Sequence, residues 1–497
     1  MANGGIIGPV NIPTSTTATG VWQQDEQYEA RVTDTWPERP LFTTKSLRFD
    51  DGSSDNLSKT FGTNNGEVYK WTYSFWVKRS SLGEKVITAS RESGTNNAII
   101  RFTSGDALEV YDYRGGMILQ KITSRLFRDV SAWYHIVVSN DNSVSSPDTK
   151  IYINGVQETS FSTDNEYSQN ERNSFNSNYP NYIGQTGASS QYFDGYIAEF
   201  IFVDGQALAP TSFGSTNSDG VWIPAIYTGT FGTNGFNLQF ENAAALGTDS
   251  SPNGNTFTVN NLTSIDQSTD YPVVNYATLN PLDVSGGQAN TLSDGNLKQT
   301  TGSRSGAVPS TRGTFGAKQG KWYIECKSVQ DGDNANRIGV AGLEDTAFVT
   351  DSNPYSIPSS YTYQNTGDKE NNDSSSSYGN SYTSGDIIGI ALDLNNGAIW
   401  FSKNGTWQNS ATQTEIENGT TTNSAFTGLD TTTYSFTAFG VTYQNTGGTK
   451  GILEWNFGSP SFSISSSNAD GNGYGNFEYA VPSGYYALNT ANLAEFG

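Results

Sequence analysis

The single histidine and the single cysteine carry the most specific chemistry in the chain. His135 lies in the alternating run Trp133–Ser139 and Cys326 in the aromatic run Trp322–Cys326, and both runs are typical of β-strands. One histidine and one cysteine exclude a His-rich zinc site, a cysteine-based zinc site and an internal disulfide. A strand position beside aromatic residues favours a framework role, so we expect both side chains to be packed.

Paired carboxylates are the other catalytic chemistry to consider. Glycoside cleavage needs two carboxyl groups about 5–10 Å apart, and 49 Asp and Glu residues always offer such pairs, for example Glu109 with Asp112 or Asp194 with Glu199. These pairs fall on expected strands or tight turns, without sign of a cleft. The sequence has no Walker A motif, no Gly-x-Ser-x-Gly elbow and no solenoid repeat of the kind usual in tailspike depolymerases. We therefore expect no enzymatic activity.

Three aspartates form the best candidate for a metal site. Asp50, Asp51 and Asp55 cluster in one Gly- and Ser-containing loop, and hard oxygen ligands suit calcium. The loop lacks the defined spacing of an EF-hand. It is a candidate calcium site, and no other cofactor is expected.

Tyrosine-rich loops are the best candidates for ligand binding, because tyrosine rings stack on sugar faces or anchor protein interfaces at low entropic cost. Two such loops occur, around residues 176–182 and 355–378. The alternative, that the rings only fix long loops to the fold, stays open. The candidate binding residues are Tyr179, Tyr182, Tyr355, Tyr361, Tyr363 and Tyr378.

Composition predicts the kind of scaffold that holds these residues. The 497 residues include 53 Gly, 27 Tyr, 26 Phe and 10 Trp, and short aromatic or β-branched runs alternate with Ser/Thr/Asn/Gly tracts. This profile is typical of an all-β protein of two or more domains. The net charge of −22 argues against a nucleic-acid ligand. No apolar run reaches eighteen residues and no signal peptide follows Met1, so we expect neither membrane insertion nor Sec export.

Regular strands begin after a proline-containing N-terminal stretch. Residues 1–42 cannot form a core alone, and we expect an extended arm that attaches to a neighbouring chain. Residues 43–210 show strands at the spacing of a sandwich. Between two of them, Asn154-Gly155 predicts a type I′ hairpin turn.

Five short motifs in this region occur in an order that resembles a laminin-G or concanavalin A-like domain. The resemblance implies a jelly roll of two antiparallel sheets, and relatives sometimes bind calcium at the rim. The motifs are Trp71–Val77, Trp133–Val138, Ile151–Gly155, Ile183–Gly184 and Asp194–Phe200.

A β-rich connector is expected over residues 211–288. Its segments Tyr227–Phe240 and Asn260–Leu282 resemble a module that recurs beside laminin-G-like domains in structural proteins of tailed bacteriophages. The arm segment Gly20–Pro37 resembles another such phage element. These resemblances imply a virion protein.

The C-terminal region, residues 289–497, resembles a SPRY domain with a C-terminal extension. Gly385–Gly405 contains two Asn-Gly turns eight residues apart and predicts a three-stranded meander. With Gly320–Glu325, Arg337–Ala341 and Leu453–Phe462 it completes the SPRY pattern over about residues 290–465. The family is a two-sheet β-sandwich that recognises ligands through its loops and has no catalytic residues. The stretch Ser352–Ser384 departs from the family and is expected to be a long loop.

The combined expectation is an all-β chain of two antiparallel jelly-roll sandwiches with an N-terminal arm. The implied function is a phage virion fibre or spike protein that binds a host surface glycan or protein through its loops. The alternative is a purely architectural virion protein, such as a capsid decoration or a tail-attached spacer. Expected partners are other virion proteins, reached through the arm, and two further copies in a homotrimer, by analogy with other phage fibres.

Overall fold

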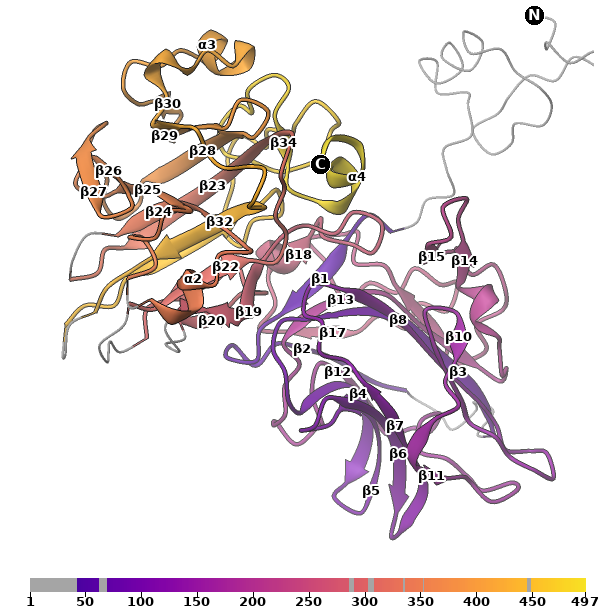
Figure 1. The fold of residues 1–497 in the computed structure, drawn as a ribbon. Coiled ribbons are helices and arrows are strands. Elements are labelled where there is room, and N and C mark those ends of the chain that lie inside the picture. Colours follow the sequence, from indigo (N-terminus) through magenta and orange to yellow (C-terminus); the bar gives the residue numbers. More distant parts are fainter. Residues whose placement is uncertain are drawn as a thin grey trace, which may run out of the picture.

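The computed structural model describes residues 43–61, 69–285, 290–302, 308–333, 336–351, 353–444 and 448–497, and these form two β-sandwiches that lie side by side (Figure 1). Strands dominate and helices are few and short, which confirms the all-β prediction. The arm expected for residues 1–42 lies outside the described residues.

The first sandwich consists of two antiparallel sheets. In sheet 1 the described strands follow the order β10 (Val156–Gln157), β9 (Lys150–Ile153), β8 (Trp133–Asp141), β3 (Lys70–Arg79), β13 (Gly195–Asp204), β1 (Ser46–Phe49) and β18 (Gln267–Ser268), and β16 (Phe236–Leu238) also pairs with β13. In sheet 2 the order is β11 (Phe161–Asn165), β7 (Met117–Leu126), β6 (Ala107–Arg114), β5 (Asn96–Phe102), β4 (Lys85–Ser93), β12 (Pro180–Ile183), β2 (Asn56–Thr60) and β17 (Thr258–Asn260).

The core of this sandwich follows from strand alternation. In β3, Trp71, Tyr73 and Phe75 occupy alternate positions and are buried between the sheets. In β13 a register shift occurs between Ala198 and Ile201, where Glu199 has a positive φ of 48°. This bulge inserts one residue into the strand.

The segment expected as a connector belongs to the first sandwich in space. Its strands β16, β17 and β18 extend sheets 1 and 2. Residues 205–231 cover the outer face of sheet 1, where Phe213 and Phe231 pack on Val137 and Val203. This cover contains η1 (Pro210–Ser212) and the hairpin of β14 (Gly214–Thr216) and β15 (Trp222–Pro224).

The second sandwich also has two sheets. In sheet 3 the described strands follow the order β19 (Leu279–Val284), β22 (Ser310–Gly313), β32 (Phe436–Val441), β24 (Arg337–Gly342), β25 (Ser360–Gln364), β26 (Asp368–Asn371) and β27 (Ser374–Ser377). In sheet 4 the order is β20 (Thr291–Ser293), β21 (Lys298–Thr300), β33 (Ile452–Asn456), β23 (Lys321–Gln330), β28 (Ile387–Asp393), β29 (Ala398–Lys403) and β30 (Thr406–Trp407); β31 (Phe426–Thr427) pairs with β29, and β34 (Tyr486–Ala487) pairs with β23.

The described helices are short connections. Besides η1, they are η2 (Ser264–Asp266), α2 (Ala347–Thr350), α3 (Gln413–Asn418), η4 (Thr421–Asn423) and α4 (Thr490–Phe496). Within the described ranges, no helix is long and apolar enough to cross a membrane.

Local turn chemistry is confirmed at two hairpins. Asn154 and Gly155 have φ values of 49° and 80°, and Asn404 and Gly405 have values of 47° and 76°, as a type I′ turn requires. A Cβ atom at position 155 would also lie 2.7 Å from the Trp222 ring, so this glycine permits a close approach. The meander β28–β29–β30 is present as expected.

The prediction of a long loop over Ser352–Ser384 is wrong. Much of this stretch forms β25, β26 and β27, which extend sheet 3. Tyr361 and Tyr363 in β25 supply core rings, while the four serines of β27 are exposed on the edge strand. An outer strand made of polar residues has the same composition as a loop. The strand forms because its backbone N–H and C=O groups pair with those of the neighbouring strand.

Candidate functional site

Three of the predicted binding tyrosines are core residues. Tyr361, Tyr363 and Tyr378 are 9%, 0% and 7% exposed. The Tyr378 hydroxyl accepts a hydrogen bond from the backbone N–H of Phe401 at 3.2 Å, and the Tyr363 ring stacks on Phe401 at 5.5 Å between centroids. Burial raises the pKa of Tyr363 to about 12. The expectation that these rings lie exposed in a loop is therefore wrong, and they fix the outer strands to the sandwich.

The remaining three tyrosines are half-buried. The hydroxyl of Tyr355 lies 2.8 Å from that of Tyr443, and the Arg337 guanidinium stacks 3.9 Å from the centre of the Tyr355 ring. Tyr182 lies in β12, and Tyr179 directly precedes that strand. None of the three lines the two pockets described below, and their role in binding stays a prediction.

The three predicted calcium ligands have partners within the protein. Asp55 accepts a hydrogen bond from the backbone N–H of Asp50 at 2.9 Å, Asp50 accepts one from Gly52 at 2.9 Å, and Asp51 pairs with Lys85. Burial raises the pKa of Asp55 to about 6. Among the described residues, no three acidic, histidine or cysteine side chains gather as a metal site would require. Calcium binding stays a prediction.

His135 is a framework residue. Its ring is fully buried and stacks on Trp76 at 4.7 Å between centroids, with Trp222 at its edge. The Trp222 indole donates to Nδ1 at 2.9 Å, so the proton resides on Nε2, which donates to the Ser74 hydroxyl at 2.9 Å. Burial lowers the pKa of His135 to about 3. Cys326 is likewise buried.

The nominated carboxylate pairs are also engaged in structure. Glu109 forms an ion pair with Arg101 at 2.7 Å. Asp112 accepts hydrogen bonds from the Tyr167 hydroxyl at 3.0 Å and the Ser174 backbone at 2.6 Å. Asp194 and Glu199 are 8% and 7% exposed, and burial raises the pKa of each to about 7.

A surface pocket of about 460 Å³ lies at one end of sheet 1, and we call it the rim pocket. On the outer face of β8, His135 and Val137 are covered by residues 205–231, but Ser139 and Asp141 lie where this cover ends. The pocket is lined by Ser139, Asp141, Val144, Ser146, Asp148, Lys150, Tyr152, Ala207, Leu208 and Ala209.

The charges of the rim pocket are only loosely compensated. Asp141 lies 3.4 Å from Lys70, and although burial acts to raise its pKa, hydrogen bonds from Ser143 and the nearby lysine hold that pKa below its usual value. Asp148 is 54% exposed and lies 4.0 Å from Lys150. Both aspartates retain oxygen lone pairs for ligand hydroxyls. The half-buried ring of Tyr152 supplies an aromatic wall.

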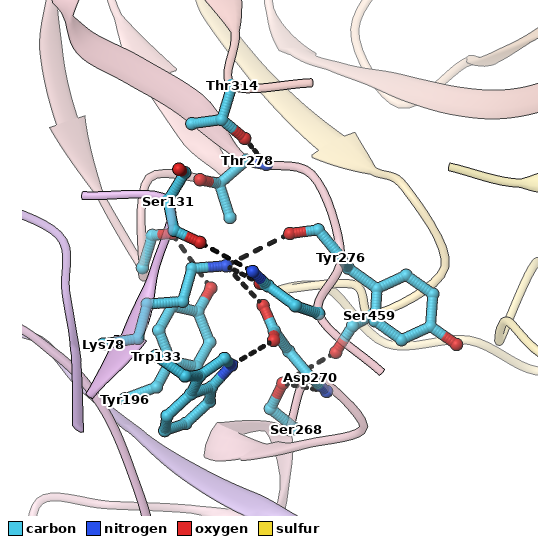
Figure 2. Close-up of polar contacts among 12 residues, drawn as sticks. Lys78, Ser131, Trp133, Tyr196, Ser268, Asp270, Tyr276, Thr278, Thr314 and Ser459 are labelled. Carbon is cyan, nitrogen blue, oxygen red and sulfur yellow. Dashed lines mark hydrogen bonds and ion pairs between the residues drawn. The ribbon is translucent and has the colours of Figure 1, made fainter. Parts of the chain in front are cut away.

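At the other end of sheet 1 a buried polar network joins the two sandwiches (Figure 2). The Lys78 ammonium, 1% exposed, donates to Asp270 at 2.8 Å, to the Asn275 side chain at 2.7 Å and to the Tyr276 carbonyl at 3.1 Å. The Trp133 indole donates to the second oxygen of Asp270 at 3.0 Å. All three donors of the ammonium are thereby satisfied.

Further contacts across this junction reach the second sandwich directly. The Tyr196 hydroxyl donates to the Gly295 carbonyl at 2.9 Å, and the Asn296 side chain donates to the Ser80 carbonyl at 2.7 Å. The Ser268 and Ser459 hydroxyls lie 2.7 Å apart. Since these contacts come from separate segments of the chain, they fix the orientation of one sandwich against the other.

The rim pocket is not predicted by any local sequence pattern. Asp141 and Asp148 flank a Ser-rich hairpin loop, which is a weak signal for a polar site. Leu208 and Ala209 reach the pocket only because β13 ends beside the start of β3. No local pattern connects them with residues about sixty positions earlier.

Comparisons with known proteins identify the two sandwich types. Residues 51–212 match the family described as the concanavalin A-like lectin/glucanases superfamily, and residues 321–451 match the SPRY domain. Both domain types expected from the sequence are therefore confirmed. A search of curated proteins finds no match, and the comparisons do not show a bacteriophage or virion origin.

Solved structures resemble parts of the chain. The SPRY domain of human HERC1 is 19% identical, with 36% of this chain and 96% of that chain covered and a TM-score of 0.27. A Bacteroides ovatus protein described as carbohydrate binding is 18% identical, with 45% and 60% covered and a TM-score of 0.31. Stonustoxin is 18% identical, with 36% and 27% covered and a TM-score of 0.26. At these scores the likenesses carry no argument about function.

Proposed function

We propose that this chain is a non-enzymatic binding protein that recognises a surface glycan through the rim pocket of its concanavalin A-like sandwich. The observation that carries the proposal is the lining of that pocket, to which Asp141, Asp148, Lys150, two serines and Tyr152 all contribute. Glycan units present both hydroxyl groups and an apolar ring face. The pocket offers a complement to each.

The chemistry of recognition follows from these groups. A carboxylate accepts hydrogen bonds from hydroxyl groups, and such charge-assisted bonds are about twice as strong as neutral ones. Asp148 is exposed and has only distant lysine partners, the nearest of which lies at 3.9 Å. The Tyr152 ring can pack on the sugar face.

We further propose that the chain acts in the virion of a tailed bacteriophage, as a fibre or spike protein that attaches to host surface glycan or protein. The support is the resemblance of the arm segment Gly20–Pro37 and of the segments Tyr227–Phe240 and Asn260–Leu282 to phage elements. The arm would contact other virion proteins, and a homotrimer is expected by analogy. Peptide mass spectrometry of purified phage particles should detect the chain, and sedimentation of the full-length protein should give a trimer. A monomer would contradict the oligomeric part.

The architectural alternative is favoured by a different observation. The buried network around Lys78 and Asp270 fixes the two sandwiches as one unit, as a decoration or spacer would require. In that role the protein would bind no glycan, and particles without it would lose integrity.

Glycan binding by the full-length protein tests the proposal. Purified protein is applied to an array of bacterial surface polysaccharides, and the affinity for a hit is measured by calorimetry. Asp148→Asn should weaken binding at least about tenfold, because a charge-assisted hydrogen bond is lost. The matched control is Asp219→Asn, an exposed aspartate in the cover segment but outside the pocket. Absence of any hit, or equal loss in both variants, would refute the binding role. Release of reducing sugar would refute the non-enzymatic part.

A further inference from the structure

A second pocket, of about 300 Å³, lies where the two sandwiches meet, and we call it the junction pocket. It is built from the residue before β1, the segment around η2 and β18, and the chain that follows β33. Its lining residues are Lys45, Ser264, Ile265, Gln267, Thr269, Ser459, Pro460, Phe462, Ser463, Ile464 and Asn476. Domain interfaces are frequent positions for ligand sites, and neither sandwich alone supplies this set.

The lining of the junction pocket is basic, in contrast to the acidic composition of the whole chain. The chain has 49 acidic and 27 basic residues, but the junction pocket contains one lysine and no carboxylate. Lys45 is half-buried and forms no ion pair with a carboxylate in the described part of the chain. A lysine in such a place can interact with an anionic ligand without first losing a protein partner.

A second cation lies directly behind the pocket wall. The Arg48 guanidinium is 1% exposed and donates to the carbonyls of Ile265 at 2.7 Å and Pro460 at 3.3 Å, two residues that line the pocket. Its nearest carboxylate is Asp266 at 3.7 Å, and its Nε has no hydrogen-bond partner. Because this charge is buried and only partly compensated, it contributes positive potential to the pocket.

The rest of the lining is suited to hydroxyl groups. Thr269 and Ser463 present hydroxyls, whereas the buried Ser459 hydroxyl already pairs with Ser268. The Asn476 Oδ1 is a buried acceptor without a hydrogen-bond partner. Phe462, 6% exposed, forms an apolar part of the wall, with the Lys327 ammonium 5.3 Å from its ring centre. The pocket volume is at the lower end of the range for small-ligand sites, roughly 300–1,000 Å³, which suits a single sugar unit.

We propose that the junction pocket binds the carboxylate-bearing sugar unit of an acidic polysaccharide, with Lys45 as the counter-ion of the carboxylate. The hydroxyl and amide groups recognise the sugar hydroxyls, and Phe462 closes the apolar part of the pocket wall. This site is separate from the rim pocket and does not depend on glycan binding there. A local positive charge at this pocket would let a protein of strongly negative net charge bind an anionic sugar there.

The test uses the full-length protein with methyl glucuronide as the probe and methyl glucoside as its neutral match. Binding is followed by saturation-transfer NMR and calorimetry at low salt. The glucuronide should bind measurably more tightly than the glucoside, and the difference should shrink as salt screens the charge. Equal binding of the two probes would overturn the proposal, as would tighter binding of inorganic phosphate than of the glucuronide.

Variants place the binding at the junction. Lys45→Gln should weaken glucuronide binding at least about tenfold, whereas Lys59→Gln, a half-buried lysine of β2 outside the pocket, should leave it unchanged. Ser463→Asp adds a carboxylate at an exposed lining position and should abolish binding without unfolding the protein. Unchanged affinity in both pocket variants would overturn the assignment. Asp148→Asn, a change in the rim pocket, should leave glucuronide binding intact. The variant therefore distinguishes binding at the junction pocket from binding at the rim pocket.

Discussion

Removal of the Lys78 ammonium should be among the most destabilising single changes at the junction. Lys78→Met keeps the length and apolar stem of the side chain but deletes three hydrogen bonds, of 2.8, 2.7 and 3.1 Å. Asp270 is 2% exposed, so its charge would remain buried and retain the Trp133 indole as its side-chain donor. Breaking a buried ion pair by removing one partner costs about 3–5 kcal/mol.

The assay is urea unfolding, followed by tryptophan fluorescence, because Trp133 itself contacts Asp270. We expect the first sandwich to lose about 3–5 kcal/mol and its unfolding to separate from that of the second sandwich. Small-angle scattering should show a larger radius of gyration as the sandwiches lose their fixed orientation.

The matched control is Lys85→Met, which removes a lysine whose partner Asp51 is 44% exposed. Surface pairs contribute about 0–1 kcal/mol, so this variant should remain close to the parent protein. A cost below about 1 kcal/mol for Lys78→Met, with unchanged scattering, would refute the reasoning that the network orients the sandwiches.

Three further predictions concern buried groups of the sandwiches. Burial lowers the pKa of His135 to about 3 in the folded protein. The contribution of the neutral ring to the free energy of unfolding is therefore complete above pH 6.5 and is lost as pH falls, by about 2 kcal/mol at pH 5. His135→Gln should remove this pH dependence in urea titrations. Burial raises the pKa of Glu199 to about 7, so the contribution of its neutral carboxyl to the free energy of unfolding is complete below pH 4.5 and is lost as pH rises. Glu199→Gln should therefore stabilise the protein by about 2–3 kcal/mol more at pH 8 than at pH 5. The opposite trend would contradict the burial of this side chain. Tyr378→Phe removes the acceptor of the Phe401 N–H and should cost about 1 kcal/mol in thermal unfolding. No loss of stability would contradict a structural role of that hydroxyl.

The features that the sequence predicted correctly are those set by a few neighbouring residues. The Asn154-Gly155 turn and the meander that includes Asn404-Gly405 need only a few adjacent residues to set their geometry. The burial of Cys326 and the framework role of His135 follow from alternation in aromatic strands. Tyr361 and Tyr363 were misplaced because β25 joins polar outer strands whose composition is that of a loop.

The sequence by itself determined the all-β class, the two sandwich types and the order of their motifs, because alternation and turn residues act over a few positions. Tertiary structure decided the rest. Strands β16 to β18 return to the first sandwich, Asp141 meets Leu208 at the rim pocket, and Lys45 meets Phe462 at the junction pocket. Each of these pairings joins residues far apart in the chain, and the free energy that selects them comes from burial across the whole fold rather than from any local pattern.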